Sequence, residues 1–428
     1  MNVLDIIATR RDGGTHEEED LRFLANGAAD RSIPDYQLSA WLMAAYLNPL
    51  SDQETAWLTK AMAESGDRID LTGLPKPWVD KHSTGGVGDK TTIVLLPILA
   101  ACGLTVVKMS GRGLGITGGT VDKLASIPGF RLDLSPEEMK AQAARIGLAL
   151  TGQTPDLAPA DKTLYALRDV TATVASIPLI VSSILSKKMA GGADTIVIDV
   201  KCGSGAFMTR MDEATKLAKL LVTTGDLCGL KVRTSISDMS QPLGSAVGNA
   251  LEVEEAFAVL AGEAFAAPTA RFRELCLHYA AETLVASGKY ATEPEARQIA
   301  ENALSSGHAL RKAHEWIEAQ GGDPDLSHLP QAQSVVPLYH EGPSGWVSKV
   351  DAETVGRAVI DLGGGRHRKE DDIDLSVGVK LHVQVGQKIE TGDLLAEVHT
   401  SEKDVTGNLK AAFEIDDMPV VEPPLFLA

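Results

Sequence analysis

The chain has 428 residues, which is beyond the roughly 250–300 residues at which one hydrophobic core stops growing, so two or three domains are expected. Apolar residues make up 44% of it, an ordinary share for a soluble globular protein. The formal net charge of −18 disfavours nucleic acid and anionic membranes as partners, so we expect any phosphate site to be local and its ligand small.

The first part of the chain, residues 1–65, is predicted to be wholly helical, because apolar residues recur at helical spacing behind two helix-start signals. Residues 66–80 have no clear period and hold two prolines and two glycines, so we interpret them as a linker. The two start signals are capping boxes, Thr15 with Glu18 and Ser51 with Glu54.

From residue 80 onward, apolar strand-like runs alternate with helices, the pattern of an α/β fold with a mostly parallel sheet. A charge-free stretch from Thr91 to Val107 is broken by Pro97 and Gly103, and it predicts a buried helix followed by a strand rather than a membrane span. The expected helix covers 90–101, and the expected strands cover 104–109, 147–151, 195–200 and 231–236.

Later segments complete the expected architecture. Two more hinges are expected at 154–160 and 191–194, and beyond about 335 the alternation around Val379 predicts short β segments. The fold class is therefore α/β, with a small all-helical domain, a larger α/β domain and a C-terminal β-rich (α+β) domain. The expected boundaries are 1–65 with 161–190 packed against it, 80–155 with 191–330 for the phosphate-binding domain, and 335–428.

The cysteines and the N-terminus point to the cytoplasm. Cys102, Cys202, Cys228 and Cys276 are widely spaced without a CxxC pair, which favours reduced thiols over disulfides or a zinc site. The opening MNVLDIIATRRDGG carries charges where a signal peptide needs an apolar run.

Two glycine-dense loops, KHSTGGVGDKTT (81–92) and KMSGRGLGITGGTVDK (108–123), concentrate anion-binding chemistry. Glycine lets backbone N–H groups converge on oxygen atoms, while hydroxyls and the ammonium groups of Lys81, Lys90 and Lys108 add donors and charge. Tight turns alone would explain the glycines but not the repeated Lys, Ser and Thr. The loops therefore predict a phosphate site.

Neither loop matches a nucleotide-binding motif well. A P-loop needs Gly before its Lys, whereas Asp89 precedes Lys90, so ATP hydrolysis is disfavoured. Gly113, Gly115 and Gly118 do satisfy GxGxxG, which keeps an NAD-dependent dehydrogenase as an alternative, although the loop carries more phosphate ligands than a pyrophosphate needs.

A third cluster lies in residues 165–188, where Arg168 and Lys187 accompany several serines. On a helix, Ser183 and Lys187 would be i, i+4 neighbours on one face. The alternative is a solvated basic helix end that complements the helix dipole.

The motifs KHSTGGVGDKTT, KMSGRGLGITGGTVDKLASIPGF, GQTPDLAPADKTLYALRDVTATVASIPLI, SSILSKKMAGG and DVKCGSGAFM together resemble the pyrimidine-nucleoside phosphorylase and thymidine phosphorylase family. The resemblance extends from the N-terminal helices through residues 238–256 to the C-terminal segment. It implies a pentosyltransferase that reversibly phosphorolyses pyrimidine nucleosides to free base and (deoxy)ribose 1-phosphate. It also implies phosphate as co-substrate, no organic cofactor and a homodimer.

The resemblance assigns roles to individual positions. His82, Arg168 and Lys187 become catalytic candidates, although His82 could equally be a satisfied structural histidine. A potassium ion held by oxygen atoms is implied at Gly88, Lys90, Leu243, Ala246 and Glu255. The implied phosphate ligands are Lys81, Ser83, Thr92, Lys108, Ser110 and Thr120, and the implied substrate ligands are His82, Leu114, Arg168, Ser183, Lys187 and Phe207.

Departures from the family pattern bear on the substrate. Ile116 stands where the family commonly has His, and Lys108 stands where strict thymidine phosphorylases tend to have Met. The extra cation favours an enzyme that also accepts uridine, with a strict thymidine phosphorylase as the alternative. A carrier protein is a further alternative, because VGQKIETGDLLAEVH resembles biotinyl or lipoyl folds, but no attachment lysine is present.

Overall fold

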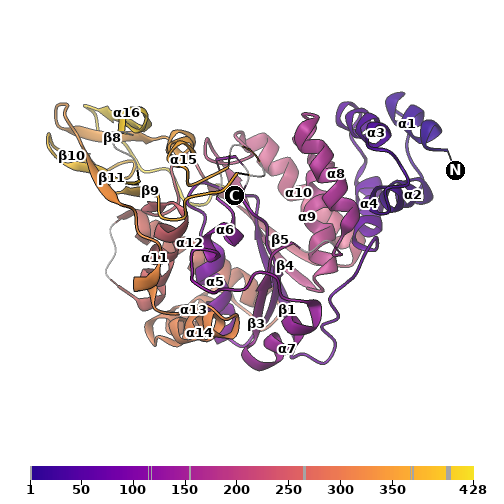
Figure 1. Cartoon of the computed structure of the whole chain (residues 1–428), viewed down its shortest axis with the longest axis horizontal. Helices are drawn as coiled ribbons and strands as arrows, with labels where there is room; N and C mark the ends of the chain where they lie inside the picture. Colours follow the sequence, from indigo (N-terminus) through magenta and orange to yellow (C-terminus); the bar gives the residue numbers. More distant parts are fainter. Residues whose placement is uncertain are drawn as a thin grey trace.

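The computed structural model describes residues 2–113, 115–116, 118–153, 156–263, 267–366, 368, 371–401 and 406–428. Figure 1 shows helices at the N-terminal end, a parallel sheet in the middle and the C-terminal strands at the opposite end. This arrangement confirms the predicted fold class of a helical part, an α/β part with a parallel sheet and a β-rich part.

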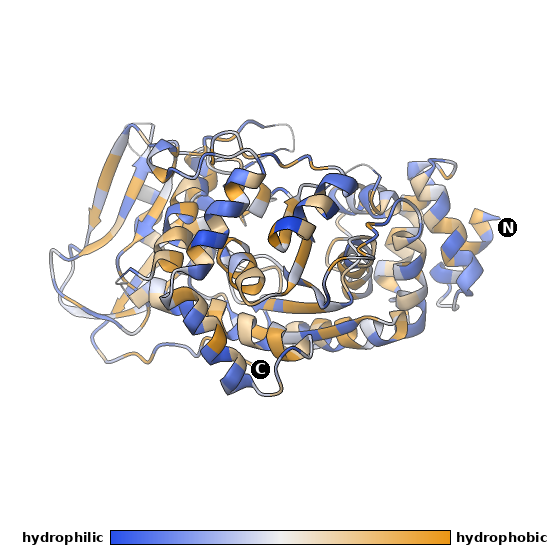
Figure 2. Ribbon diagram, turned by 90° about the horizontal axis from the view of Figure 1, so that it is seen from below, coloured by the Kyte–Doolittle hydropathy of each residue, from blue (hydrophilic) through white to orange (hydrophobic). Residues whose placement is uncertain are grey.

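The N-terminal part is helical, as predicted, and shares one core with two helices from later in the chain. Leu21, Leu24 and Trp41 are fully buried in this core. The helices are α1 (Val3–Arg11), α2 (Glu18–Ala29), α3 (Asp35–Leu47) and α4 (Asp52–Ala63), together with α8 (Pro159–Val170) and α9 (Ile177–Ala190), which pack against α2, α3 and α4. The N-terminal helices alternate hydrophobic and hydrophilic residues, as Figure 2 shows.

One of the two predicted capping boxes is confirmed. The Ser51 side chain accepts from the Glu54 N–H (3.3 Å), and Glu54 accepts from the Ser51 N–H (2.8 Å). The prediction at Thr15 is wrong, because α2 has Glu17 as its N-cap and the Glu17 N–H donates to Asp20 (3.1 Å). The helix thus begins two residues later than predicted, and a carboxylate at its third position, that of Asp20, accepts from the N–H of the N-cap residue Glu17.

The central sheet has five parallel strands in the order β3-β2-β1-β4-β5. The strands predicted at 104–109, 147–151, 195–200 and 231–236 are confirmed, but the central strand falls partly in the supposed linker and was not predicted. Its sequence WVDKHS contains three ionisable residues, so no apolar run announces it. The strands are β1 (Trp78–Ser83), β2 (Thr105–Met109), β3 (Leu148–Thr151), β4 (Thr195–Cys202) and β5 (Lys231–Asp238).

Helices cover both faces of this sheet. The predicted buried helix at 90–101 is confirmed as α5, which lies in the large core on one face with Phe272 and Trp316. No helix in the described part of the chain is long and apolar enough to cross a bilayer. The helices on this face are α5 (Thr91–Ala101), α11 (Asn249–Ala261), α12 (Ala267–Ala286), α13 (Glu293–Ser305) and α14 (His308–Ala319). The other face is covered by α9 and α10 (Met211–Cys228). In addition, α7 (Pro136–Ile146) packs on β2 and β3, and α6 (Thr120–Leu124) follows the second glycine loop.

The C-terminal part forms two antiparallel sheets, β10-β8-β12 and β6-β9-β11-β7. Val379, Leu381, Val383 and Val385 are all buried, as their alternation predicted, although the strand itself ends at Leu381. The elements are η1 (Leu326–His328), β7 (Ser334–Tyr339), β8 (Gly345–Val350), α15 (Ala352–Asp361), β9 (Gly378–Leu381), β10 (Lys388–Ile389), β11 (Leu394–Thr400), α16 (Thr406–Leu409), η2 (Lys410–Ala412) and β12 (Phe413–Asp416).

One strand of these sheets comes from elsewhere in the chain. β6 (Ala246–Val247) lies between the end of β5 and α11, yet it pairs with β9. The α/β part therefore supplies an edge strand of the C-terminal sheet.

The four cysteines are free thiols.

Candidate active site

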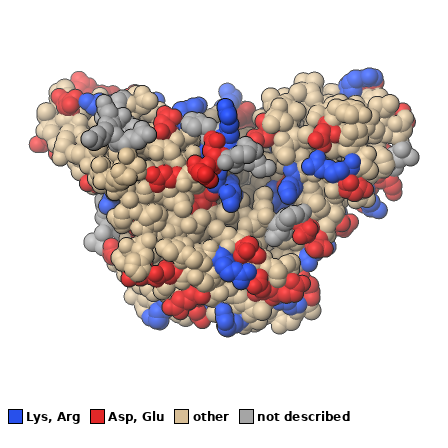
Figure 3. Space-filling view, in the orientation of Figure 1, with Lys and Arg blue, Asp and Glu red and all other residues tan. Residues whose placement is uncertain are grey.

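The two glycine loops lie at the carboxyl edge of the parallel sheet, where α/β folds bind their ligands. The loop after β1 runs beside the loop after β4, because the Val87 N–H donates to Gly205 O (3.2 Å). In the second loop, a Cβ on Gly119 would lie 2.1 Å from the Gly113 nitrogen, so only glycine allows this close approach. Figure 3 shows Lys and Arg side chains in the hollow of this face, beside much acidic surface.

The expected phosphate ligands with hydroxyl groups are distributed around this edge. Ser83 ends β1, Ser110 follows β2, Thr92 lies in the first turn of α5, and Thr120 is the first residue of α6. The helix start at Thr92 adds backbone N–H groups and a favourable dipole for an anion.

Lys81 provides a buried positive charge without a hydrogen bond. Its side chain is fully buried, and within the described residues its Nζ has no hydrogen-bond partner. The nearest carboxylate oxygen, on Asp199, is 3.8 Å away, and the Tyr279 ring centroid is 5.5 Å away. The neighbouring Lys201, by contrast, bonds Asp199 at 2.6 Å. A buried ammonium without acceptors is unfavourable, so this group is chemically prepared for an anion.

Lys108 lies close to Lys81 but is held differently. Its Nζ donates to Asp80 (3.2 Å) and to the Lys81 carbonyl, and the other oxygen of Asp80 accepts from Lys188 (2.6 Å). Burial lowers the pKa of Lys108 to about 7. The ammonium therefore gains and loses its proton near neutral pH.

His82 is half-buried and makes no side-chain hydrogen bond with the residues that the structure describes. Burial, and after it the charges of Lys188 and Lys108, lower the pKa of His82 well below its usual value. The imidazole is therefore neutral at neutral pH, and it can donate a hydrogen bond but is a poor reservoir of protons.

Ser183 and Lys187 do share one face of α9. The Lys187 Nζ donates to Ser183 Oγ (2.9 Å) and to Asp161 Oδ2 (2.6 Å), and it lies 5.7 Å from the Tyr165 ring centroid. The Lys187 side chain remains 19% exposed, so it is partly accessible to solvent. This cluster is a specific polar site rather than a fully solvated helix end.

Arg168 lies in the same region with its donors directed at the backbone. It is 2% exposed, and it donates to the carbonyl groups of Leu179 (3.0 Å), Val174 (2.6 Å) and Thr173 (3.5 Å). Its observed contacts therefore hold the turn between α8 and α9, and a contact with substrate stays a prediction.

The other expected substrate residues are less constrained. Phe207 is 47% exposed in the loop after β4, and Leu114 lies outside the described residues. Ile116 packs against the C-terminal part, where a Cβ on Gly356 would lie 2.9 Å from its carbonyl oxygen. The residue that departs from the family pattern thus contacts α15 of the C-terminal part.

Sequence reasoning missed the carboxylates that hold these lysines. Asp80 pairs with Lys188, and Asp161 pairs with Lys187. The partners in each pair are more than 20 residues apart in the sequence, so only folding brings them together. The five residues expected around potassium do lie together, but the Lys90 ammonium itself donates to Leu243 O and Ala246 O.

Comparison with known proteins matches the whole architecture. Residues 4–66 match a helical bundle domain and residues 75–310 an a/b domain of the glycosyl transferase family, and residues 346–416 match a pyrimidine nucleoside phosphorylase C-terminal domain. The pyrimidine-nucleoside phosphorylase of Geobacillus stearothermophilus is 46% identical over 99% of each chain. That of Bacillus subtilis (strain 168) is 48% identical over 95% of this chain and 93% of its own.

Among solved structures, the crystal structure of anthranilate phosphoribosyltransferase from Thermus thermophilus is similar with a TM-score of 0.61 and 18% identity. The similarity covers 74% of this chain and 99% of that one. At this identity it supports the fold alone.

Proposed function

This chain belongs to the pyrimidine-nucleoside phosphorylase family, and from that premise we propose that it phosphorolyses uridine, thymidine and deoxyuridine. A phosphate oxygen bonds to the anomeric carbon, and the bond from that carbon to the pyrimidine nitrogen breaks. The electron pair stays on the base, which takes a proton from solvent, and (deoxy)ribose 1-phosphate is the other product. The NAD-dependent dehydrogenase and carrier alternatives are not favoured by these relatives.

The proposal rests on the buried Lys81 ammonium, which makes no hydrogen bond with the residues that the structure describes. A phosphate oxygen entering between the loops would supply the missing acceptor, and the hydroxyls of Ser83, Ser110, Thr92 and Thr120 would complete the site. Phosphate is already an anionic nucleophile, so the protein has to position it rather than activate it.

The leaving base would bind at the other cluster. Negative charge develops on the pyrimidine as the glycosidic bond breaks, and Lys187 with Ser183 can stabilise it in the transition state. Neutral His82 would donate a hydrogen bond to the base rather than a proton. Arg168 would orient this side of the site through the turn that it holds.

We further propose that the two clusters approach each other during the reaction. The proposed phosphate ligands lie on the sheet and its loops, whereas Ser183 and Lys187 lie on α9, which packs with the N-terminal part. Closure about 66–80, 154–160 and 191–194 would bring them together and exclude water. Small-angle scattering should show compaction when phosphate and a nucleoside analogue bind together, and an unchanged radius would count against closure.

A homodimer through the N-terminal helices is part of this proposal. α1 and α3 expose large apolar side chains, which favour a partner surface. They are Leu4, Tyr36, Met43, Tyr46 and Leu47. Sedimentation at micromolar concentration should give twice the chain mass.

The deciding assay measures release of free base from uridine, thymidine and deoxyuridine with and without phosphate. We expect phosphate-dependent release from all three. No release from any of them would refute the proposal, and release from the deoxynucleosides but not from uridine would support the strict thymidine phosphorylase instead.

A further inference from the structure

The buried ammonium of Lys90 occupies the centre of the oxygen cluster at which the family resemblance places a potassium ion. Its Nζ lies 2.8 Å from Leu243 O, 2.7 Å from Ala246 O and 2.6 Å from Glu255 Oε2. We propose that this lysine replaces the metal ion, so that the chain carries its own monovalent cation and needs no potassium.

The ammonium fits this position completely. A lysine has three N–H donors, and Lys90 has three oxygen acceptors at hydrogen-bond distance. The Phe272 ring centroid lies 5.2 Å from Nζ and adds a cation–π contact. Lys90 is 1% exposed, so neither water nor salt screens these contacts.

A potassium ion does not fit beside it. The ion would need the same carbonyl and carboxylate oxygens, and it would lie against a second positive charge in a buried site. The backbone leaves little room as well, because a Cβ on Gly88 would lie 2.7 Å from Leu243 O and 3.3 Å from Ala246 O. The oxygen atoms expected for the metal are present, but the space between them is filled.

Glu255 is satisfied by the same arrangement. Its Oε2 lies 2.6 Å from the Lys90 ammonium. Its oxygens accept from the N–H groups of Ser245 and Ala246 (both 2.8 Å) and from Thr269 Oγ1 (2.6 Å). Within the described residues, both carboxylate oxygens therefore have partners without a metal.

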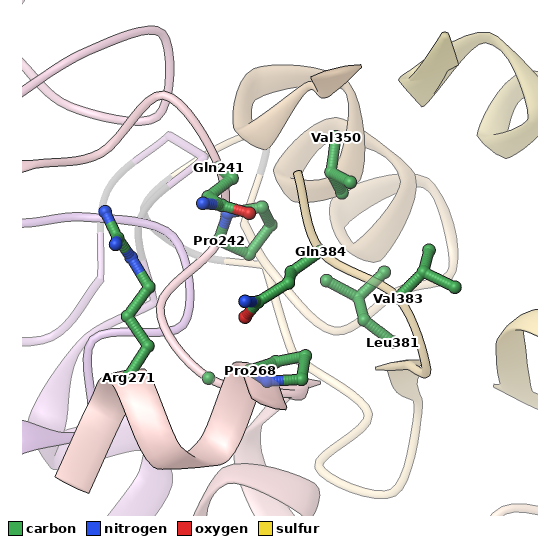
Figure 4. Close-up of a pocket in the computed structure, with 9 residues that line it drawn as sticks. Gln241, Pro242, Pro268, Arg271, Val350, Leu381, Val383 and Gln384 are labelled. Carbon is green, nitrogen blue, oxygen red and sulfur yellow. The ribbon is translucent and has the colours of Figure 1, made fainter. Parts of the chain in front are cut away.

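The position of the ammonium explains what it does. Lys90 is the N-cap residue of α5 in the first glycine loop, whereas Leu243 lies just before β6 and Ala246 is the first residue of β6. That segment also meets the C-terminal part, since Gln241 Oε1 accepts from Val385 N–H (3.1 Å), and Figure 4 shows Gln241 and Pro242 facing Leu381, Val383 and Gln384. Lys90 thus acts as a positioning residue that joins the proposed phosphate loop to this junction.

The first experiment compares the intact chain, dialysed free of salt, in potassium, sodium and choline chloride of equal ionic strength. We expect melting temperatures that agree within about 1 °C, because the folded chain offers none of these cations a binding site that the unfolded chain lacks. Since melting does not depend on turnover, this test stays valid even if the proposed reaction is wrong. A melting temperature that rises in potassium alone would overturn the proposal.

The second experiment uses two variants that both remove the charge. Lys90→Ala leaves space among the oxygens, and Lys90→Met fills it. In choline, each should melt about 5–10 °C lower, because Glu255 loses its partner. Potassium should restore part of this loss, and with it the KM for phosphate, in Lys90→Ala only.

Equal responses of the two variants to potassium would show that the ammonium does not fill an ion site, which contradicts the proposal. If neither variant folds, the comparison of the intact chain in the three salts still decides. Lys123→Ala is a matched control. Lys123 also pairs with a carboxylate of α11, Glu252 (2.6 Å), and donates to one carbonyl, Asp89 O (2.7 Å), so its loss leaves too few oxygens to bind potassium.

Discussion

The phosphate side and the base side of the proposed site hold their positive charges in different ways. On the phosphate side, Lys81 is fixed in the central strand with no hydrogen-bond partner among the described residues. On the base side, Lys187 and Arg168 lie on helices with their donors already satisfied by a carboxylate and by backbone carbonyls. The first arrangement can accept an anion without exchanging partners, whereas the second must exchange some of them when the base binds.

The largest effect should come from Lys81→Met. Without the Lys81 ammonium we expect kcat/KM to fall about 10²–10³-fold, in the range found when one donor to a developing charge is removed. The melting temperature should fall little, because Lys81 makes no hydrogen bond within the described residues and its nearest carboxylate oxygen is 3.8 Å away. Steady-state assays with varied phosphate and thermal melts measure the two quantities.

The matched control is Lys201→Met on the neighbouring strand. Lys201 pairs with Asp199 at 2.6 Å, so its loss should destabilise the fold by about 3–5 kcal/mol. If Lys81→Met lost as much stability as Lys201→Met, the two lysines would be equivalent, and the contrast between the distant contact of Lys81 with Asp199 (3.8 Å) and the close one of Lys201 (2.6 Å) would be wrong.

On the base side, Lys187→Met should lower kcat/KM for uridine about 10²-fold, with little change in the KM for phosphate. Asp161→Asn keeps the ammonium but removes its charged partner, so it should lose much less activity. Equal losses in both variants would mean that Lys187 acts only within the pair and not on the base.

Lys108 should produce a pH effect. Its pKa of about 7 predicts that phosphate binding weakens as pH rises through neutrality and the ammonium loses its proton. The arginine in Lys108→Arg stays charged, so the fall in kcat/KM above neutral pH should disappear in this variant. A fall that persisted would come from the ionisation of phosphate itself.

Lys108 should also affect folding. Between about pH 7 and its usual value of 10.5, the folded chain binds fewer protons at this group than the unfolded chain. The free energy of unfolding should therefore rise with pH in this window because of Lys108. Melts of the intact chain and of Lys108→Met across the window test the sign.

The smallest effect should come from Ile116→His. Ile116 packs against Gly356 of α15, so an imidazole there should lower the free energy of unfolding by about 1 kcal/mol. We expect the ratio of uridine to thymidine turnover to change less than tenfold. A larger change would place residue 116 in the substrate pocket rather than at the contact with the C-terminal part.

Much of the fold could be predicted because its elements follow local patterns. The charge-free α5 and the apolar runs in β2, β3 and β4 have clear signals, and the i, i+4 spacing predicted that Ser183 and Lys187 meet. β1 had no such signal, since the central strand carries Asp80, Lys81 and His82. These ionisable residues interrupt the apolar pattern by which a buried strand is recognised in a sequence.

The state of each buried lysine could not be predicted. Lys81 and Lys90 stand nine residues apart in one glycine loop, yet one has no hydrogen-bond partner in the described structure and the other has three. The difference depends on Leu243, Ala246 and Glu255, which lie more than 150 residues away. Only the folded chain shows which of the two ammonium groups already has oxygen acceptors at hydrogen-bond distance.

The two-residue strand β6 limits how the chain can be divided in protein engineering. Because β6 supplies an edge of the C-terminal sheet, a fragment starting near residue 334 would expose an unpaired edge of β9 and should aggregate. The carbonyl of Ala246 in this strand is also an acceptor of Lys90. A chimera that exchanges C-terminal parts between relatives would therefore have to carry residues 243–247 with the exchanged part.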